Sequence, residues 1–125
     1  KQVLLLQRSS NDSRNAGLWE FPGGKIDSGE EMNSGLAREV LEETGLEIEI
    51  APSIAHVETE LIEGGKYNGR LYVALFYAVQ RLTGDVVLSG EHDAAAWEEP
   101  SSAAEYDLTP ESRRALLSLH KLGII

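Results

Sequence analysis

Three glutamates, Glu39, Glu42 and Glu43, are spaced so that their side chains lie together on one face of an α-helix. Like charges at these spacings destabilise a bare helix by roughly a few tenths of a kcal/mol per pair, so a sequence that keeps them is expected to use them. Carboxylates without cysteine or histidine beside them are typical ligands of Mg²⁺ or Mn²⁺ rather than of zinc. The cluster therefore indicates a site for a divalent cation.

A fixed pattern of residues surrounds these glutamates. From Gly24 to Leu46 the sequence reads G-x5-E-x7-R-E-V-x-E-E-x-G-L. Charged runs are usually solvated surface, but a chance match of so many spaced residues is very improbable at ordinary amino-acid frequencies. Arg38 follows Glu30 by eight residues and precedes Glu42 by four, so its planar guanidinium is able to bridge both carboxylates.

The segment Gly24–Leu46 resembles a complete Nudix box, the signature of the Nudix hydrolase family. The residues that lead into it, LWEFPGG from Leu18, are similar to those of the MutT-like members. The resemblance implies hydrolysis of a nucleoside diphosphate linked to another group, with Mg²⁺ or Mn²⁺ as the cofactor. It also implies an α/β fold, the Nudix-type α/β/α sandwich, in which a mixed β-sheet is flanked by the Nudix-box helix and a C-terminal helix.

The resemblance further implies a set of metal ligands. Glu39, Glu42 and Glu43 match the metal-binding carboxylates of the family, and the carbonyl of Gly23 matches a backbone ligand. Glu91, in Ser89-Gly90-Glu91-His92, lies where many members place a further carboxylate that acts as a metal ligand or general base. An exposed loop acid is the alternative interpretation of Glu91.

Catalytic and bracing roles are implied in the same way. Glu39 matches the residue that orients or deprotonates the attacking water. The other expected catalytic residues are Glu42, Glu91 and Arg38. Glu30 and Arg38 also match the pair that braces the loop–helix–loop of the box.

Four residues are expected to contact the substrate. Arg8, after the first predicted strand, resembles a position that contacts substrate phosphate in MutT-like members, and Arg70 is a second candidate; either can instead be a surface arginine. Phe21 can stack on a base, although core packing is a more common role for phenylalanine. Gly24 is the fourth residue. His92 alone is expected to be a hydrogen-bonded surface histidine.

Hydrophobic patterning and turn residues predict the strands that position these side chains. Extended segments are expected over Val3–Leu6, Leu18–Phe21, Glu47–Ile50, His56–Ile62, Arg70–Val79, Val86–Leu88 and Ala95–Glu98. The segments His56–Ile62 and Arg70–Val79 form a predicted hairpin. Loops are expected over Ser9–Gly17 and Pro100–Asp107.

Two helices are predicted. The first spans Ser28–Thr44 and ends at Gly45, which suits a left-handed C-terminal cap. The second begins after an N-cap at Thr109, has Pro110 at its first position and runs to Lys121.

Length and composition limit the possible functions. The 125 residues suffice for one domain, residues 1–125, and contain no cysteine, which fits a cytoplasmic location. The net charge of −10 argues against binding to a nucleic-acid polymer. No apolar run approaches the roughly 18–20 residues that a membrane span requires. Because the chain opens without Met and directly in an apolar run, residues upstream, including an edge or partner strand, are expected to be missing.

Three functional hypotheses remain open. The preferred one is a MutT-like pyrophosphohydrolase, monomeric or homodimeric, that acts on a nucleoside triphosphate. A pyrophosphatase for ADP-ribose or another nucleotide sugar is the alternative enzyme, and a non-catalytic nucleotide-sensing module is the alternative from another class. MutT-like hydrolases of oxidised guanine use an asparagine from a late loop to recognise the base. The segment Ser101–Asp107 has none, which argues against 8-oxo-dGTP as the substrate.

Overall fold

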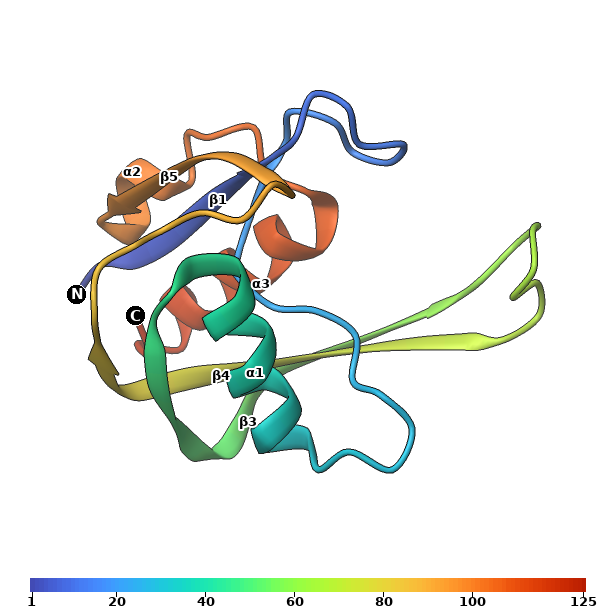
Figure 1. Cartoon of the computed structure of the whole chain (residues 1–125), viewed down its shortest axis with the longest axis horizontal. Helices are drawn as coiled ribbons and strands as arrows, with labels where there is room; N and C mark the ends of the chain where they lie inside the picture. The colour runs from blue at the N-terminus through green and yellow to red at the C-terminus, as the bar shows by residue number, and fades with distance from the viewer.

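Two antiparallel sheets and three helices make up the fold of the computed structural model, which describes residues 1–125 (Figure 1). In chain order the elements are β1 (Val3–Arg8), β2 (Trp19–Glu20), α1 (Met32–Thr44), β3 (Glu47–Leu61), β4 (Leu71–Thr83), β5 (His92–Glu98), α2 (Pro100–Ala103) and α3 (Pro110–Lys121). This arrangement confirms the predicted α/β class.

The first sheet has the strand order β2–β1–β5. β2 pairs with the end of β1 through Leu6 and Glu20, and β5 pairs along the whole of β1 from Val3 with Glu98 to Arg8 with His92. Strands that are adjacent in space thus bring together segments far apart in sequence. In particular, Glu20 of β2 and His92 of β5 both lie beside the C-terminal end of β1.

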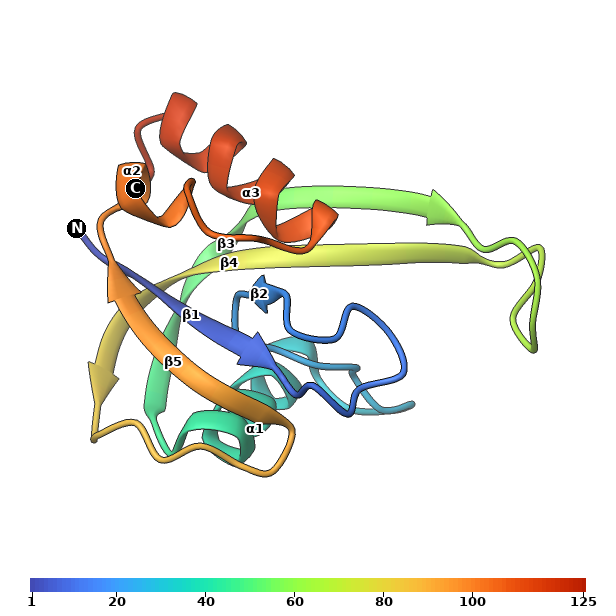
Figure 2. The same ribbon diagram turned by 90° about the horizontal axis from the view of Figure 1, so that it is seen from above.

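The second sheet is a long hairpin of β3 and β4, whose far end extends away from the rest of the molecule (Figures 1 and 2). Its register runs from Leu61 with Leu71 to Glu47 with Thr83 and shifts between Glu49 and His56. Such irregularities bend and twist a strand pair. Figure 2 shows that β3 curves strongly over this part of its length.

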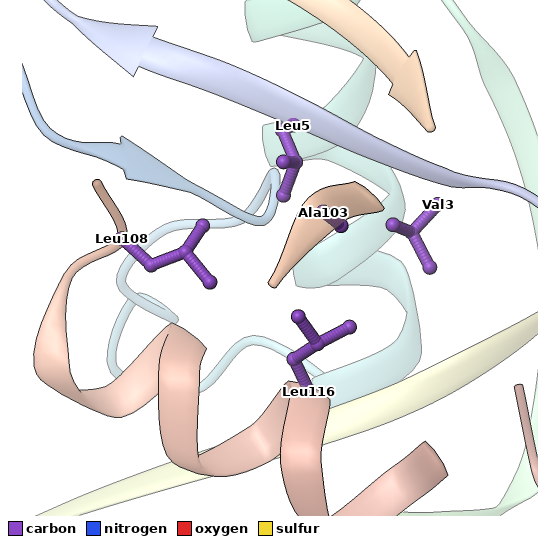
Figure 3. Packing of buried hydrophobic residues seen from close by; sticks show 5 residues of the cluster. All are labelled: Val3, Leu5, Ala103, Leu108 and Leu116. Carbon is purple, nitrogen blue, oxygen red and sulfur yellow. The ribbon is translucent and has the colours of Figure 1, made fainter. Parts of the chain in front are cut away.

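Alternate residues of β1 pack into two separate cores, because successive side chains of a strand point to opposite faces. Val3 and Leu5 pack with Leu116 of α3 and with residues of the α2–α3 region, as Figure 3 shows. Leu4 and Leu6 pack with Val40 of α1 and with Leu46. The sheet is therefore covered by α1 on one face and by α2 and α3 on the other, as expected for the sandwich.

Details of the sheets and loops differ from the sequence-based expectation. The pairings within both sheets are antiparallel, and an isolated bridge between Trp19 and Leu108 is parallel. The predicted strands Glu47–Ile50 and His56–Ile62 are parts of the continuous β3. Pro100–Ala103, predicted as loop, is a helical turn.

Two predicted segments were wrong for identifiable reasons. α1 begins at Met32 rather than Ser28, because Gly29 has a φ of 82°, which a right-handed helix does not allow. Val86–Leu88 is not a strand: the amide of Val87 donates to the carbonyl of Thr44 at 2.8 Å, at the end of α1, instead of to a neighbouring strand. None of the helices combines the length and the apolar character needed to cross a lipid bilayer.

Candidate metal and catalytic site

The predicted carboxylates meet in one polar pocket. It has a volume of about 310 Å³ and is lined by Glu39, Glu42 and Glu43 of α1 and by the loop Ser89–Glu91 before β5. No hydrophobic side chain lines it. Crowded carboxylates repel one another unless cations neutralise them, and hard oxygen donors suit Mg²⁺ or Mn²⁺. The donors present therefore fit the divalent cation that the sequence predicts.

Backbone hydrogen bonds hold the two parts of the pocket together. The amide of Val87 donates to the carbonyl of Thr44, and the amide of Ser89 donates to the carbonyl of Glu43 at 3.3 Å. These carbonyls belong to the last turn of α1, where no partner within the helix is available. Satisfying them with the distal loop brings Glu91 next to the glutamates of α1.

The sequence of α1 determines which of its side chains face the core or the pocket, and where the helix ends. Val40 of α1 is buried in the core, whereas the carboxylates of Glu39 and Glu42 project toward the pocket. Gly45 ends the helix with a φ of 73° and donates its amide to the carbonyl of Leu41. Glycine adopts this left-handed conformation without the steric cost that other residues incur.

Arg38 connects the helix to the loop that precedes it. Its Nε and Nη2 atoms donate to the Glu30 carboxylate at 2.7 and 2.9 Å, and Nη1 donates to Glu39 Oε1 at 3.0 Å and to Glu42 Oε2 at 3.2 Å. Hydrogen bonds from Arg38 and from the amide of Asp27 lower the pKa of Glu30 to about 2. These contacts tie the loop before α1 to the helix, and the bracing role of Glu30 and Arg38 stays a prediction.

Glu43 is the buried member of the carboxylate cluster, with 5% of its surface exposed. Its Oε1 accepts a hydrogen bond from the amide of Gly23 at 2.8 Å. Burial raises the pKa of Glu43 to about 7, although the Gly23 hydrogen bond and the nearby His92 oppose this shift. Gly23 therefore contacts the carboxylate cluster through its backbone amide. The carbonyl of Gly23 stays a predicted metal ligand.

His92 occupies a position that the sequence did not suggest. It is buried, rather than at the surface as predicted, and its Nε2 donates to Glu20 Oε2 at 3.0 Å. Its Nδ1 lies 3.6 Å from Glu43 Oε2 and has no hydrogen-bond partner. Burial lowers the pKa of His92, but Glu20 and Glu43 outweigh this effect and raise it overall.

Glu20 and His92 were missed because neither belongs to the box. Ligand atoms of Glu20, Glu43 and His92 lie within 4.8 Å of one another, a spacing that can hold a metal ion. The available signals were weak: an acidic residue in an otherwise apolar and glycine-rich lead-in, and a histidine directly after Glu91. Only the pairing of β2 and β5 with β1 shows that they meet.

The four residues expected to contact the substrate occupy different environments. Arg8 is engaged by Glu20, with distances of 3.0 and 3.2 Å, by Asp12 at 2.7 Å and by the carbonyl of Arg14 at 3.1 Å. Phe21 packs edge-to-face on Phe76, with ring centroids 6.2 Å apart.

Gly24 lies against the carboxylate of Glu39 so closely that a Cβ at position 24 would overlap it. A residue larger than glycine at position 24 would therefore displace the Glu39 carboxylate.

Arg70 and Lys66 lie in the turn of the long hairpin near Tyr67, and Lys25 of the loop before α1 approaches the same tyrosine. The guanidinium of Arg70 is 5.6 Å from the ring centre of Tyr67, and the Nζ atoms of Lys66 and Lys25 are 5.4 and 5.9 Å from the same point. Tyr67 and Lys25 line a cleft of about 1660 Å³ that also includes Glu39. The cluster is therefore basic, aromatic and connected with the carboxylate pocket through this cleft.

Comparison with known proteins gives consistent matches. A sequence model of the NUDIX domain matches residues 1–119. The CTP pyrophosphohydrolase of Escherichia coli is 34% identical over 87% of this chain and 75% of its own length, and a putative 8-oxo-dGTP diphosphatase 2 of Mycobacterium tuberculosis is 32% identical over 89% and 74%. The solution structure of the E. coli ORF135 protein has a TM-score of 0.82 and 30% identity, and the match covers 98% of this chain and 81% of that one.

Proposed function

The chain belongs to the Nudix family of hydrolases, and from this premise we propose that it is a Mg²⁺- or Mn²⁺-dependent, MutT-like pyrophosphohydrolase acting on a nucleoside triphosphate. The observation that carries the proposal is the convergence of Glu39, Glu42, Glu43 and Glu91 on one polar pocket. The helix α1 and the loop before β5 supply these carboxylates, and clustered carboxylates can hold divalent cations against phosphate groups.

The residues of the pocket have separate roles in this proposal. Glu39, Glu42, Glu43 and Glu91, with the carbonyl of Gly23, would hold the cation. A bound cation would neutralise the negative charge of the phosphate oxygens and lower the pKa of a bound water molecule. In the proposed reaction a water oxygen would attack the α-phosphorus and the bridging P–O bond would break, so that a nucleoside triphosphate would give a nucleoside monophosphate and pyrophosphate.

A carboxylate of the pocket accepts the proton of the attacking water. Glu39 is well placed for this role, because Arg38 holds its Oε1 at 3.0 Å and the backbone at Gly24 lies against its other oxygen. Glu91, which lines the same pocket from the loop before β5, is the second candidate. A general base positioned in this way contributes about 10²- to 10⁴-fold to the rate.

The basic cluster at the hairpin supports a polyphosphate substrate. Lys25, Lys66 and Arg70 surround one exposed tyrosine ring and form no ion pair with a carboxylate, in a protein with a net charge of −10. Cations left free in an acidic protein attract anionic ligands. We assign Arg70 to substrate binding on this ground, whereas Arg8 would need to exchange a carboxylate partner for phosphate.

The test is a screen for released phosphate and pyrophosphate over nucleoside triphosphates, ADP-ribose and nucleotide sugars, with Mg²⁺ and with Mn²⁺. Pyrophosphate release from a triphosphate, abolished by EDTA and reduced about 10²- to 10⁴-fold in Glu39→Gln, is the expected result. Glu47→Gln, an exposed glutamate of β3 outside the pocket, is the matched control.

Each other outcome of the screen selects an alternative. Turnover restricted to ADP-ribose or nucleotide sugars would establish the nucleotide-sugar pyrophosphatase. Metal-dependent nucleotide binding without release from any compound would establish the sensing module. Full hydrolysis by Glu39→Gln would refute the assigned base.

A further inference from the structure

His92 is buried between two carboxylates although the loop before it is exposed. Its side chain is 3% exposed, Nε2 donates to Glu20 Oε2, and Nδ1 lies 3.6 Å from Glu43 Oε2 without a hydrogen-bond partner. A buried polar atom without a partner costs free energy, so such atoms are rare and call for a specific explanation. The position of Nδ1 beside Glu43 suggests that this explanation lies in the carboxylate pocket.

Glu20 fixes the histidine ring from the side opposite to Glu43. The guanidinium of Arg8 donates to both oxygens of Glu20, and Asp12 holds the same guanidinium from its other end. The carboxylate of Glu20 therefore has an anchor that does not depend on His92. Because Nε2 is bound to this anchored carboxylate, the orientation of the ring, and with it the direction of Nδ1, is determined by β2.

Glu43 is approached by different elements at its two oxygens. Its Oε1 accepts from the amide of Gly23 in the lead-in loop, and its Oε2 faces Nδ1 of His92 at the start of β5. Because Oε1 is hydrogen-bonded and Oε2 lies against the buried histidine ring, the carboxylate has little room to rotate. The same histidine directly follows Glu91, so the contact also fixes where the distal loop lies relative to α1.

We propose that His92, oriented by Glu20, is a positioning residue of the carboxylate pocket: it sets the direction of the Glu43 carboxylate and the place of Glu91 relative to α1. The inference rests on the proposed function, since it assumes that these carboxylates hold a divalent cation. His92 touches no substrate in this role. Outer partners that orient metal ligands typically change metal affinity or activity by about 10- to 100-fold when they are replaced.

Two substitutions separate the contacts of the ring. The amide of asparagine in His92→Asn lies near the place of Nδ1 and can still face Glu43, whereas the amide of glutamine in His92→Gln lies near the place of Nε2 and can still bind Glu20. The readout is Mn²⁺ affinity of the whole chain without substrate, measured by electron paramagnetic resonance. We expect His92→Gln to bind Mn²⁺ about 10- to 100-fold more weakly, and His92→Asn to stay closer to the wild type.

Controls distinguish positioning from stability. His120→Gln changes an exposed histidine of α3 and should leave Mn²⁺ affinity unchanged. Glu20→Gln, which alters the anchor without touching Glu43, should weaken Mn²⁺ binding while Gly23 and Glu43 keep their contact. Melting temperatures and far-ultraviolet circular dichroism identify any variant that fails to fold. If a His92 variant fails to fold, the Mn²⁺ affinity of Glu20→Gln decides the test.

The proposal is overturned if folded His92→Gln and Glu20→Gln bind Mn²⁺ as the wild type does, or if His92→Asn loses more affinity than His92→Gln. Because the readout needs no turnover, it is independent of the nucleotide screen. Wild-type protein that binds Mn²⁺ but hydrolyses no nucleotide would refute the proposed function and still allow this test.

Discussion

The Arg38 guanidinium binds the Glu30 carboxylate at two points, with 2.7 Å from Nε to Oε2 and 2.9 Å from Nη2 to Oε1. Its remaining nitrogen reaches Glu39 and Glu42 at 3.0 and 3.2 Å. One cation thus links the loop before α1 to two pocket carboxylates and reduces the repulsion between them. A planar group with donors on several sides is needed for all these contacts, and lysine lacks this geometry.

Arg38→Lys is therefore expected to damage the pocket although it keeps the charge. A lysine can satisfy one carboxylate but not Glu30, Glu39 and Glu42 together, so kcat/KM should fall about 10- to 100-fold, as for other residues that orient a metal site. Steady-state kinetics with the identified nucleotide measure the effect. The control is Arg114→Lys, which alters an equally short pair with Glu58 at 2.7 and 2.9 Å outside the pocket; equal losses in both variants would contradict the prediction.

The elements that follow from local sequence were predicted well. The box helix and its end at Gly45 depend on residue spacing and on one left-handed glycine, and α3 depends on the cap at Thr109 and on Pro110. The convergence of the box carboxylates in one pocket likewise follows from helical periodicity, because α1 alone carries three of them.

Features that arise from pairing of distant segments were not predictable. Glu20 and His92 are separated by 72 residues and meet only because β2 and β5 flank the same strand. The segment Val86–Leu88 has the composition of a strand, but the open carbonyls at the end of α1 bind it instead. The first residues of the predicted box helix form a loop because Gly29 and the Glu30–Arg38 pair favour another backbone path.

Acid unfolding should reveal the low pKa of Glu30. Arg38 lowers this pKa to about 2 from its ordinary value of 4.5, so the folded state releases the proton more readily than the unfolded state. The resulting stability is fully present above about pH 4.5 and is lost as the pH falls toward 2. Urea unfolding of Glu30→Gln should therefore show a smaller loss of stability over this interval than the wild type.

The neighbouring exposed residue gives the control for this pH effect. Glu31→Gln removes a carboxylate at the N-cap of α1 whose side chain forms no capping hydrogen bond. Its acid unfolding should follow the wild type between pH 4.5 and 2. A Glu30→Gln variant with the wild-type pH dependence would show that the pair contributes nothing to stability.

Glu43→Gln should stabilise the metal-free protein while it weakens metal binding. Burial raises the pKa of Glu43 to about 7 from 4.5, so this group contributes stability below about pH 4.5 that is lost as the pH rises through 7. At pH 8 in EDTA a neutral glutamine avoids this cost, and the free energy of unfolding should rise by roughly 1–3 kcal/mol. Thermal unfolding with and without saturating Mg²⁺ measures both effects, since a cation that binds only the folded state stabilises it.

The gain in melting temperature on adding Mg²⁺ should differ between the wild type and the variant. Mg²⁺ should raise the melting temperature of the wild type clearly and that of Glu43→Gln less. A variant that is less stable than the wild type in EDTA at pH 8 would show that the buried carboxylate is well compensated, and would contradict the prediction.

Gly35→Ala should impair the protein although alanine favours helix by roughly 1 kcal/mol over glycine. A Cβ at position 35 would lie 2.8 Å from Ile26 Cδ1 and 2.8 Å from Glu30 Oε1, so these two side chains must shift, and the Glu30 carboxylate is held in place by Arg38. Overpacking of this kind typically costs about 1–3 kcal/mol. Chemical denaturation measures the loss, and Ser34→Ala, at an exposed position of the same helix, should be neutral or slightly stabilising.

Arg70→Ala should raise KM with little change in kcat, because the hairpin cluster lies apart from the reacting carboxylates and binds substrate and transition state equally. Loss of one cation near an anionic substrate is expected to raise KM about 3- to 10-fold at low salt, and the difference should shrink as salt screens the charges. Lys121→Ala, at the exposed end of α3 and outside the cleft, is the control. An unchanged KM for Arg70→Ala at every salt concentration would exclude Arg70 from substrate binding, whereas an equal rise in both variants would indicate a general effect of net charge.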